Sequence, residues 1–304
     1  MVGAPKLRRP LLAVFQRRGT FVAERSLWQD CRRRLAGNRA AMVATGLLSL
    51  VLFLAIFGPS VSPYRYDQID AQFVRTAPDV ANRHYFGTDA NGRDLFVRVL
   101  YGARVSLAVG VLATLVSLII GVSYGAVAGY VGGRIDNLMM RFVDVMYSLP
   151  FMFFVIVLMV VFGRNIFLIF IALGAVEWLT MARIVRGQAK SLKEKEFIQA
   201  ARVAGVGPAG IIARHLVPNL LGPVIVYATL TIPQVILVES FLSFLGLGVQ
   251  EPMTSWGVLI HEGAREMEVT PWMLLFPAVF LSVTLLCFNT LGDGLRDALD
   301  PKDR

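Results

Sequence analysis

The chain has 304 residues, of which 56% are hydrophobic and 17% are charged, and it carries a formal net charge of +9. Since a soluble protein of this length would have about a quarter charged residues, the composition excludes an ordinary soluble domain. The basic surplus would suit nucleic acid, but no basic stripe interleaved with aromatic residues supports binding to nucleic acid. The apolar residues fall in charge-free blocks of about the 20 residues that cross a bilayer. The sequence therefore predicts an all-α polytopic membrane protein, because lipid offers no partner for free backbone groups.

Six membrane-spanning helices are predicted from these blocks. They lie at about residues 41–61, 105–130, 138–162, 165–182, 220–242 and 272–291. The third is expected to break or bend at Pro150, and the fifth contains Pro223 and Pro233. Such breaks are tolerated where neighbouring helices or a cavity satisfy the freed carbonyl groups.

The second predicted helix has a face of small residues. Gly121, Gly125 and Gly129 recur every four residues. This spacing puts them on one side of the helix and predicts close contact with a neighbouring helix. Packing inside the bundle is preferred over the alternative of a pore lining.

The distribution of basic residues predicts the orientation. On the six-helix plan, 22 of the 30 Lys and Arg residues lie on one side of the membrane. The positive-inside rule puts that side, and both termini, in the cytoplasm. The expected segments are a basic cytoplasmic stretch (residues 1–40) that faces anionic lipid, a first transmembrane helix (41–62), an extracytoplasmic loop (63–100), a five-helix core (101–292) and a cytoplasmic tail (293–304).

Two carboxylates within the predicted spans are candidate contacts along a translocation path. Ionisable residues at membrane depth are functional hypotheses by default. Glu177 lies in the short fourth span, and interfacial pairing near Arg183 is the preferred alternative. Glu239 comes late in the fifth span, where an outer-boundary position is the alternative to a cavity-facing one.

The turn-rich run at residues 86–94 holds Asp89 and Arg93. It lacks the number of ligands that calcium requires. Asx turns and local pairing of Arg with Asp explain this run more simply than a metal site.

Residues 190–218 form a basic, amphipathic segment between two predicted spans. Its first half, from Leu192 to Ala201, has good helix formers with alternating charge. Gly205 is expected to end this helix as a left-handed cap, and a second helix is expected to start near Ala209 and run toward Pro218. An amphipathic loop on the membrane surface is the alternative, but a hinged helix pair suits transmission of a partner's push into the membrane.

No enzyme active site is predicted. The chain has no Gly-Lys-Ser/Thr sequence, so the usual phosphate-binding loop for a nucleotide is missing. Its three histidines, His84, His215 and His261, fall in three different loops, which argues against a shared metal site. No cofactor or metal is therefore expected on this chain.

The chain resembles the C-type inner-membrane permease subunit of bacterial oligopeptide ABC importers. The resemblance covers about nine-tenths of the sequence, from near Ser26 to the C-terminus. Besides residues 190–218, it rests on the blocks at residues 86–94, 102–107, 241–248, 251–257 and 292–301. The pattern of residues 190–218 is specific to importers, and the other blocks are specific to the peptide and nickel branch.

The resemblance implies a six-helix permease of the type I importer kind in a bacterial inner membrane. It implies a homologous second permease, two cytoplasmic ATPase subunits that hold ATP and magnesium, and an extracytoplasmic peptide-binding protein. It also implies that residues 190–218 are the coupling loop on which an ATPase docks. The docking residues carried over are Glu196, Gln199, Ala200, Ala201, Gly205, His215 and Pro218.

Two of these positions differ among importers. Gln199 stands where the family usually has Glu, and it keeps length and hydrogen bonding without the charge. His215 stands where more distant importers have Ile, as is usual in the peptide branch. Oligopeptides are the expected substrate. The alternatives are dipeptides, nickel or glycosides within the same family, or a secondary transporter or channel outside it.

Overall fold

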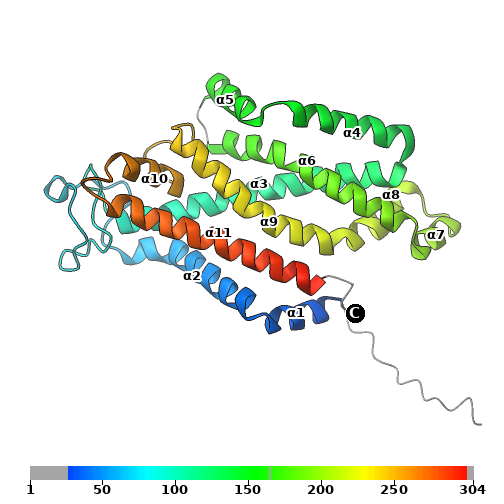
Figure 1. Cartoon of the computed structure of the whole chain (residues 1–304), viewed down its shortest axis with the longest axis horizontal. Helices are drawn as coiled ribbons and strands as arrows, with labels where there is room; N and C mark the ends of the chain where they lie inside the picture. The colour runs from blue at the N-terminus through cyan, green and yellow to red at the C-terminus, as the bar shows by residue number, and fades with distance from the viewer. Residues whose placement is uncertain (1–26, 164–165, 300–304) are drawn as a thin grey trace, which may run out of the picture.

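The computed structural model describes residues 27–163 and 166–299 (Figure 1). Within these ranges all regular structure is helical, apart from the isolated bridges Asp79 with His84 and Thr88 with Asp94. Most of the predicted basic N-terminal segment, the turn at residues 164–165 and the end of the tail (300–304) lie outside the described residues. The all-α prediction is confirmed for the described part.

Most elements follow one another with short connections; the longer ones are the loop at residues 62–94 and the segment at residues 245–255. They are α1 (Leu27–Gly37), α2 (Arg39–Val61), the 3-10 turn η1 (Ala71–Phe73), α3 (Leu95–Val131), α4 (Gly133–Ser148), α5 (Phe151–Phe162), α6 (Ile166–Lys193), α7 (Glu196–Val203), α8 (Pro208–Ile211), the π-helical turn η2 (Ile212–Leu216), α9 (Val217–Phe244), α10 (Trp256–Arg265) and α11 (Trp272–Leu299).

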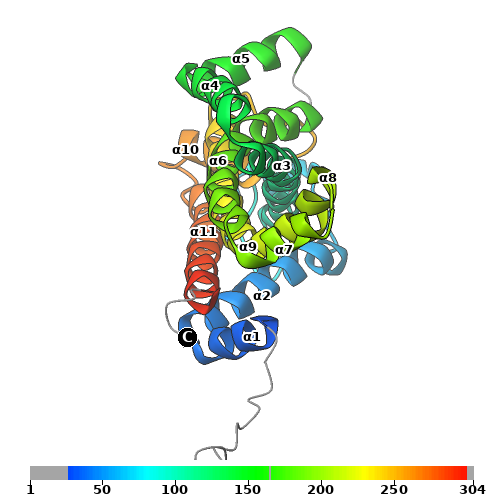
Figure 2. The ribbon, with the colours of Figure 1, turned by 90° about the vertical axis from the view of Figure 1, so that its right-hand side faces the viewer.

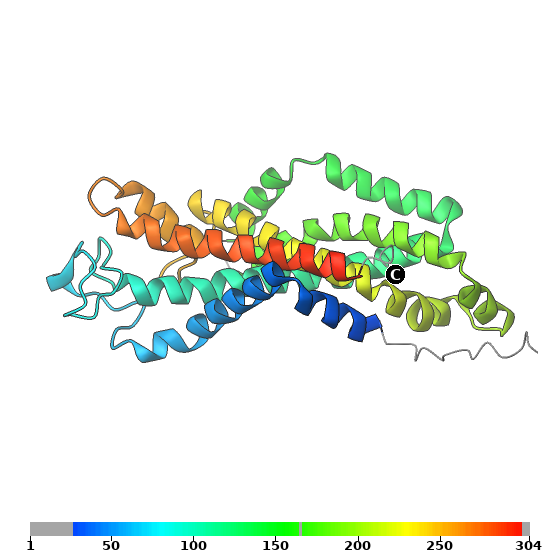
Figure 3. The ribbon, with the colours of Figure 1, turned by 60° about the horizontal axis from the view of Figure 1, so that its bottom comes forward.

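The long helices lie side by side in an elongated bundle (Figures 1 and 3). At one end lie the loop of residues 62–94 and α10, and we call this the α10 end. At the other lie α7 and α8, which we call the α7 end. Helix α3 is central and packs against α2, α6 and α9. The bundle thus has two chemically distinct ends joined by apolar helices.

By length and composition, the described residues contain four helices able to cross a membrane: α2, α3, the continuous helix at Pro208–Phe244 and α11. The pair α4 and α5, bent by 80°, makes a fifth if it counts as one span. The described residues therefore show four or five helices that meet this criterion, instead of the six spans predicted. Helix α6 is not in this set.

The bend predicted at Pro150 is confirmed. Helix α4 ends at Ser148, and Pro150 precedes the first residue of α5. Proline favours this position because it lacks the N–H that a continuing helix would use. Helix α4 begins at Gly133 rather than near residue 138, after a turn in which Gly132 and Gly133 both have positive φ (72° and 59°).

Two other helices extend beyond their predicted limits. Helix α3 begins at Leu95 rather than near residue 105, because the Asp94 carboxylate caps it by accepting a hydrogen bond from the Val97 N–H at 2.9 Å. Helix α11 continues to Leu299, so most of the predicted tail is helical. Charged residues near a helix end mark the limit of the membrane, and they do not end the helix.

The small-residue face predicted on α3 is confirmed as a helix contact. A Cβ atom added at Gly125 would lie 2.5 Å from the Ala182 carbonyl oxygen, and one at Gly129 would lie 2.6 Å from the Ala189 Cβ. Gly121 meets the side chain of Met181 in the same way, at 2.6 Å. The backbones of α3 and α6 therefore approach too closely for any side chain at these glycines, which joins the two helices along much of their length.

Candidate functional site

The candidate site is the segment at residues 190–218, which connects α6 to α9 at the α7 end (Figures 1 and 2). The predicted first helix from Leu192 to Ala201 is interrupted. Helix α6 ends at Lys193, and α7 starts at Glu196. After this break the Ile198 side chain of α7 is fully buried. Burial of this apolar side chain stabilises the turn between α6 and α7.

Helix α7 has an inner and an outer face. Ile198 and Ala201, three residues apart, are buried in a cluster that also contains Leu216 and Leu220. Glu196, Gln199 and Ala200 are exposed. Two further exposed side chains, of Phe197 (40% exposed) and Val203 (90% exposed), are apolar. We call the set Glu196, Phe197, Gln199, Ala200 and Val203 the α7 outer face.

Ala200 and Ala201, predicted as one docking pair, therefore differ in exposure: Ala200 is exposed and Ala201 is buried. Only Ala200 is available to a partner in this structure. Ala201 packs with the protein's own core and supports the helix from beneath. Among the apolar residues of α7, Ile198 is buried, whereas Phe197 and Val203 are exposed.

The left-handed cap predicted at Gly205 is confirmed. Its φ is 79°, a value that L side chains rarely adopt. The Gly205 N–H donates to the Arg202 carbonyl at 3.0 Å, and the Val206 N–H donates to the Ala201 carbonyl at 3.1 Å. The second of these bonds closes the last turn of α7 as a helix C-cap does.

The second predicted helix does not end at Pro218. It begins at Pro208 and passes through η2 into α9. Pro218 has no N–H, and the helix accommodates it with a wider turn in which the Val217 N–H donates to the Ile212 carbonyl. Nearby, the Asn219 side-chain amide donates to the His215 carbonyl at 2.6 Å. Pro218 is exposed and His215 is half-buried.

The two candidate path carboxylates do not lie together. Glu177 is half-buried on α6, and Arg183 pairs with Asp144 of α4 at 2.6 Å rather than with Glu177. Glu239 on α9 is fully buried inside the chain. Neither position joins residues 190–218.

Glu239 is held by a network of serines that sequence reasoning missed. The Ser243 hydroxyl donates to Glu239 Oε1 at 2.7 Å, and the Ser106 hydroxyl donates to Oε2 at 3.3 Å. Ser106 also accepts a hydrogen bond from the Trp256 N–H at 3.2 Å, at the start of α10. The carboxylate therefore ties α3, α9 and α10 together, and buried polar groups of this kind need such partners.

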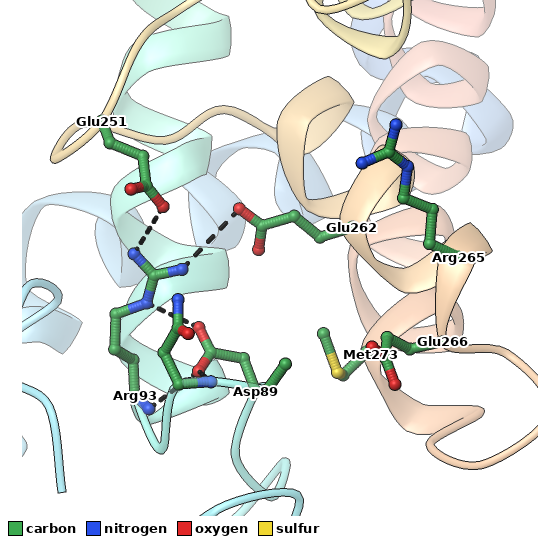
Figure 4. A pocket seen from close by; sticks show the side chains of 9 residues that line it. Asp89, Arg93, Glu251, Glu262, Arg265, Glu266 and Met273 are labelled. Atoms are coloured by element: carbon green, nitrogen blue, oxygen red, sulfur yellow. Dashed lines mark hydrogen bonds and ion pairs between the residues drawn. The ribbon is translucent and has the colours of Figure 1, made fainter.

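At the α10 end, a second polar cluster surrounds Asp89 (Figure 4). The predicted Asx turn and local pairing are confirmed: one Asp89 oxygen accepts the Asn91 and Arg93 N–H groups at 2.8 and 2.9 Å, and the other accepts Arg93 Nε at 2.7 Å. Arg98 binds the same carboxylate. Asp89 thus has its acceptor positions filled by this chain's own donors.

The cluster extends to residues distant in sequence. Arg93 reaches Glu251 at 2.9 Å, and Arg98 reaches Glu262 of α10 at 2.7 Å. Burial lowers the pKa of the Arg93 guanidinium, but the neighbouring Asp89 charge and the hydrogen bonds to carboxylates outweigh it, so the pKa lies above its ordinary value. A pocket of about 230 Å³ opens beside the cluster and is lined also by Arg265, Glu266 and Met273.

This geometry describes a helical membrane protein with an exposed short helix at one end and a polar cap at the other. Residues 121–304 match the family described as "Binding-protein-dependent transport system inner membrane component", and residues 26–78 match "N-terminal TM domain of oligopeptide transport permease C". The chain belongs to this family of binding-protein-dependent inner-membrane transport components. It is accordingly a multi-pass protein of the inner membrane and a permease subunit.

Relatives of known description match along nearly the whole chain. The oligopeptide transport system permease protein OppC of Escherichia coli (strain K12) is 59% identical over 283 residues, which cover 93% of this chain and 94% of the relative. Its counterpart in Haemophilus influenzae is 56% identical over 280 residues, covering 92% and 90%. The dipeptide transport system permease protein DppC of Bacillus subtilis is 48% identical over 280 residues, covering 92% and 87%.

Proposed function

We propose that this protein is the permease subunit of an ATP-driven importer of oligopeptides. With a homologous second permease it forms the translocation path, and an extracytoplasmic binding protein delivers the peptide. The substrate is inferred from the two oligopeptide permeases described above, which are 59% and 56% identical to this chain over nearly its whole length. In Bacillus subtilis the dipeptide permease is 48% identical and the oligopeptide permease 44%, so dipeptides are the second candidate. Nickel and glycosides are the further alternatives within the same family.

ATP hydrolysis belongs to two partner ATPase subunits, which carry the ATP and magnesium. This chain has no Gly-Lys-Ser/Thr sequence with which to hold a nucleotide in the usual phosphate loop. Membership of this family also argues against a stand-alone channel or secondary transporter, because the family's description names dependence on a binding protein.

The proposed topology has six spans and both termini in the cytoplasm. Helix α6 is the added span: its 28 residues reach about 42 Å at 1.5 Å per residue, enough for a hydrocarbon core of about 30 Å. It packs along α3, which crosses the membrane by length and composition. The α7 end, to which most basic residues map, is then cytoplasmic, and the α10 end is extracytoplasmic.

The α7 outer face is the proposed docking surface for an ATPase subunit. The observation that carries this assignment is Val203, an apolar side chain 90% exposed on a short helix at the end of the bundle. Beside it lie the exposed Glu196, Gln199 and Ala200. Four further residues hold this surface in place, because they lie in the core beneath α7 or in the segment that runs from α7 into α9. They are Ala201, Gly205, His215 and Pro218.

Val203→Asp tests the docking surface. A charge placed in a closely packed contact without a partner should weaken the ATPase association about tenfold or more. Val80→Asp is the matched control, because Val80 is also exposed (77%) but lies in the loop at the α10 end. The measurement is co-purification of the ATPase with the permease, together with peptide-stimulated ATP hydrolysis.

Ala200→Arg provides a second probe of the same face. Ala201→Arg is less suitable, because Ala201 is buried and a long side chain there would disturb the core of the permease itself. If both Val203→Asp and Ala200→Arg retain the ATPase and transport peptide like the wild type, the docking assignment is wrong.

A further inference from the structure

Tyr130 is the second-to-last residue of α3. Its ring lies close to two cations, one on each side of the break between α6 and α7. The Arg202 guanidinium carbon on α7 is 5.3 Å from the ring centroid. The Lys193 ammonium at the end of α6 is 5.9 Å from it. A cation over an aromatic face within about 6 Å is attracted by the ring quadrupole. One side chain therefore contacts both helices that meet at the break.

The position of the ring is itself fixed by packing. Tyr130 is 8% exposed and belongs to the same buried cluster as Ile198 and Ala201 of α7. The preceding residue, Gly129, is in close contact with Ala189 of α6. Hence the part of the α3 backbone that carries the ring cannot shift relative to α6 without disturbing the glycine contact between these helices.

The two cations have few competing partners. Within the described ranges, no salt bridge joins Lys193 or Arg202 to a carboxylate. The Arg202 side chain has a hydrogen bond to Gln199 Oε1, but at 3.5 Å it is long. By contrast, Lys190 and Arg186, about one and two turns before Lys193 on α6, pair with Asp136 at 2.6 and 2.5 Å. The ring is thus a contact that Lys193 and Arg202 share across the break.

We propose that Tyr130 is a positioning residue for α7. Its cation contacts set the direction of α7 relative to the ends of α3 and α6, so that a displacement of α7 passes into the α3–α6 pair. This role rests on the proposed function, in which α7 receives the ATPase. Tyr130 itself touches no partner, since its ring lies beneath α7.

The alternative is that Tyr130 only fills space in the buried cluster. Two substitutions first show whether the ring is needed. Tyr130→Phe keeps the aromatic face and loses only the hydroxyl, whereas Tyr130→Leu loses the ring quadrupole and also leaves a small cavity. Because a residue that merely fills space would give the same order of effects, the charge variant described below separates the two roles.

The experiment uses the complete transporter in proteoliposomes, with tri-alanine as the probe and ATPase retention measured alongside. Tyr130→Leu should lower the peptide transported per ATP hydrolysed about two- to fivefold, because an exposed or partly buried cation–ring contact has an energy that corresponds to this factor. Tyr130→Phe should transport like the wild type, and the ATPase should stay bound in both variants.

A charge variant tests the same contact without altering the core. Lys193→Gln combined with Arg202→Gln should reproduce the loss seen in Tyr130→Leu, and adding Tyr130→Leu to it should cause little further loss. Normal coupling in the Gln pair, or equal coupling in the Leu and Phe variants with the ATPase retained, would overturn the role of Tyr130. Failure of the wild type itself to retain an ATPase would instead reject the proposed docking function.

Discussion

The guanidinium of Arg104 on α3 donates a hydrogen bond to the backbone carbonyl of Ala55 on α2. Four residues after Ala55, at the position whose N–H would normally bond this carbonyl, the helix has Pro59. Proline has no N–H to donate, so the carbonyl needs another partner in an apolar environment. A second Arg104 nitrogen donates to the next carbonyl, that of Ile56, at 2.6 Å. Arg104 thus completes the hydrogen bonding of a proline-containing helix.

Arg104→Leu is expected to destabilise the protein by about 1–3 kcal/mol, because it leaves a carbonyl of α2 without a donor. Thermal unfolding of the purified protein in detergent measures this change. Arg104→Lys should recover part of the stability, since an ammonium can still donate but cannot span both carbonyls as a guanidinium does. Equal stability of the Leu variant and the wild type would show that water or lipid headgroups satisfy these carbonyls.

Gly125→Ala should destabilise the bundle by about 1–3 kcal/mol through overpacking. The added methyl group would meet the Ala182 carbonyl and the Val185 side chain of α6, both within 3 Å. The matched control is Gly187→Ala, where nothing lies within 4 Å of the added atom. This control should be neutral or more stable by up to about 1 kcal/mol, because alanine favours a helix. Unfolding in detergent distinguishes the two, and equal effects would argue against a close α3–α6 contact.

The α3–α6 contact was predictable because helix periodicity turns a four-residue spacing of glycines into a face. The same reasoning holds for Gly205 and for the bend at Pro150, where backbone chemistry acts locally. It does not hold for the face of α7. Ala200 and Ala201 have the same side chain, and only the position of the buried cluster determines that Ala201 points inward.

The polar networks were not predictable for a related reason. Arg93 pairs with Glu251, and Glu239 lies among serines from α3 and α9. These partners are distant in sequence, and a single sequence does not show which charged or hydroxyl groups the packing brings together.

Gly205→Val should misplace the return from α7 to α8. A φ of 79° costs a non-glycine residue about 1–2 kcal/mol, and more for a β-branched one. Because nothing lies within 4 Å of an added Cβ, the cost comes from the backbone alone. Gly205→Asn is the control, since Asn tolerates this conformation. Peptide uptake should fall in the Val variant while insertion into the membrane stays normal, and the Asn variant should retain most uptake. Equal uptake in the Val variant and the wild type would contradict the hinge.

The contact between Arg75 and Glu266 should depend on pH. Two hydrogen bonds from Arg75, at 3.0 and 2.9 Å, hold the pKa of the Glu266 carboxyl below its usual value. A carboxylate with a lowered pKa in the folded state contributes stability above its unfolded pKa of about 4.3, and that stability is lost as the pH falls through the folded pKa. The loop that carries Arg75 should therefore be better protected at neutral than at acidic pH.

Glu266→Gln measures this contribution by hydrogen exchange of the loop at residues 74–76. At about pH 7 the variant should exchange faster than the wild type, and the difference should shrink as the pH falls toward about 3. Glu268→Gln removes the same charge from an exposed side chain two residues away and should have little effect. A difference that persists or grows in acid would show that the ion pair is not its cause.

The proposed orientation predicts which loops are accessible from outside the cell. The α7 end holds the basic surplus and should face the cytoplasm, so a cysteine at the exposed Lys195 should escape a membrane-impermeant thiol reagent in intact cells. A cysteine at the exposed Asn91, at the α10 end, should react. The native thiols of Cys31 and Cys287 are both buried, which keeps the background low. After permeabilisation both probes should react, which controls for accessibility. Labelling at residue 195 but not at 91 in intact cells would reverse the orientation and remove the α7 outer face from the side where an ATPase could reach it.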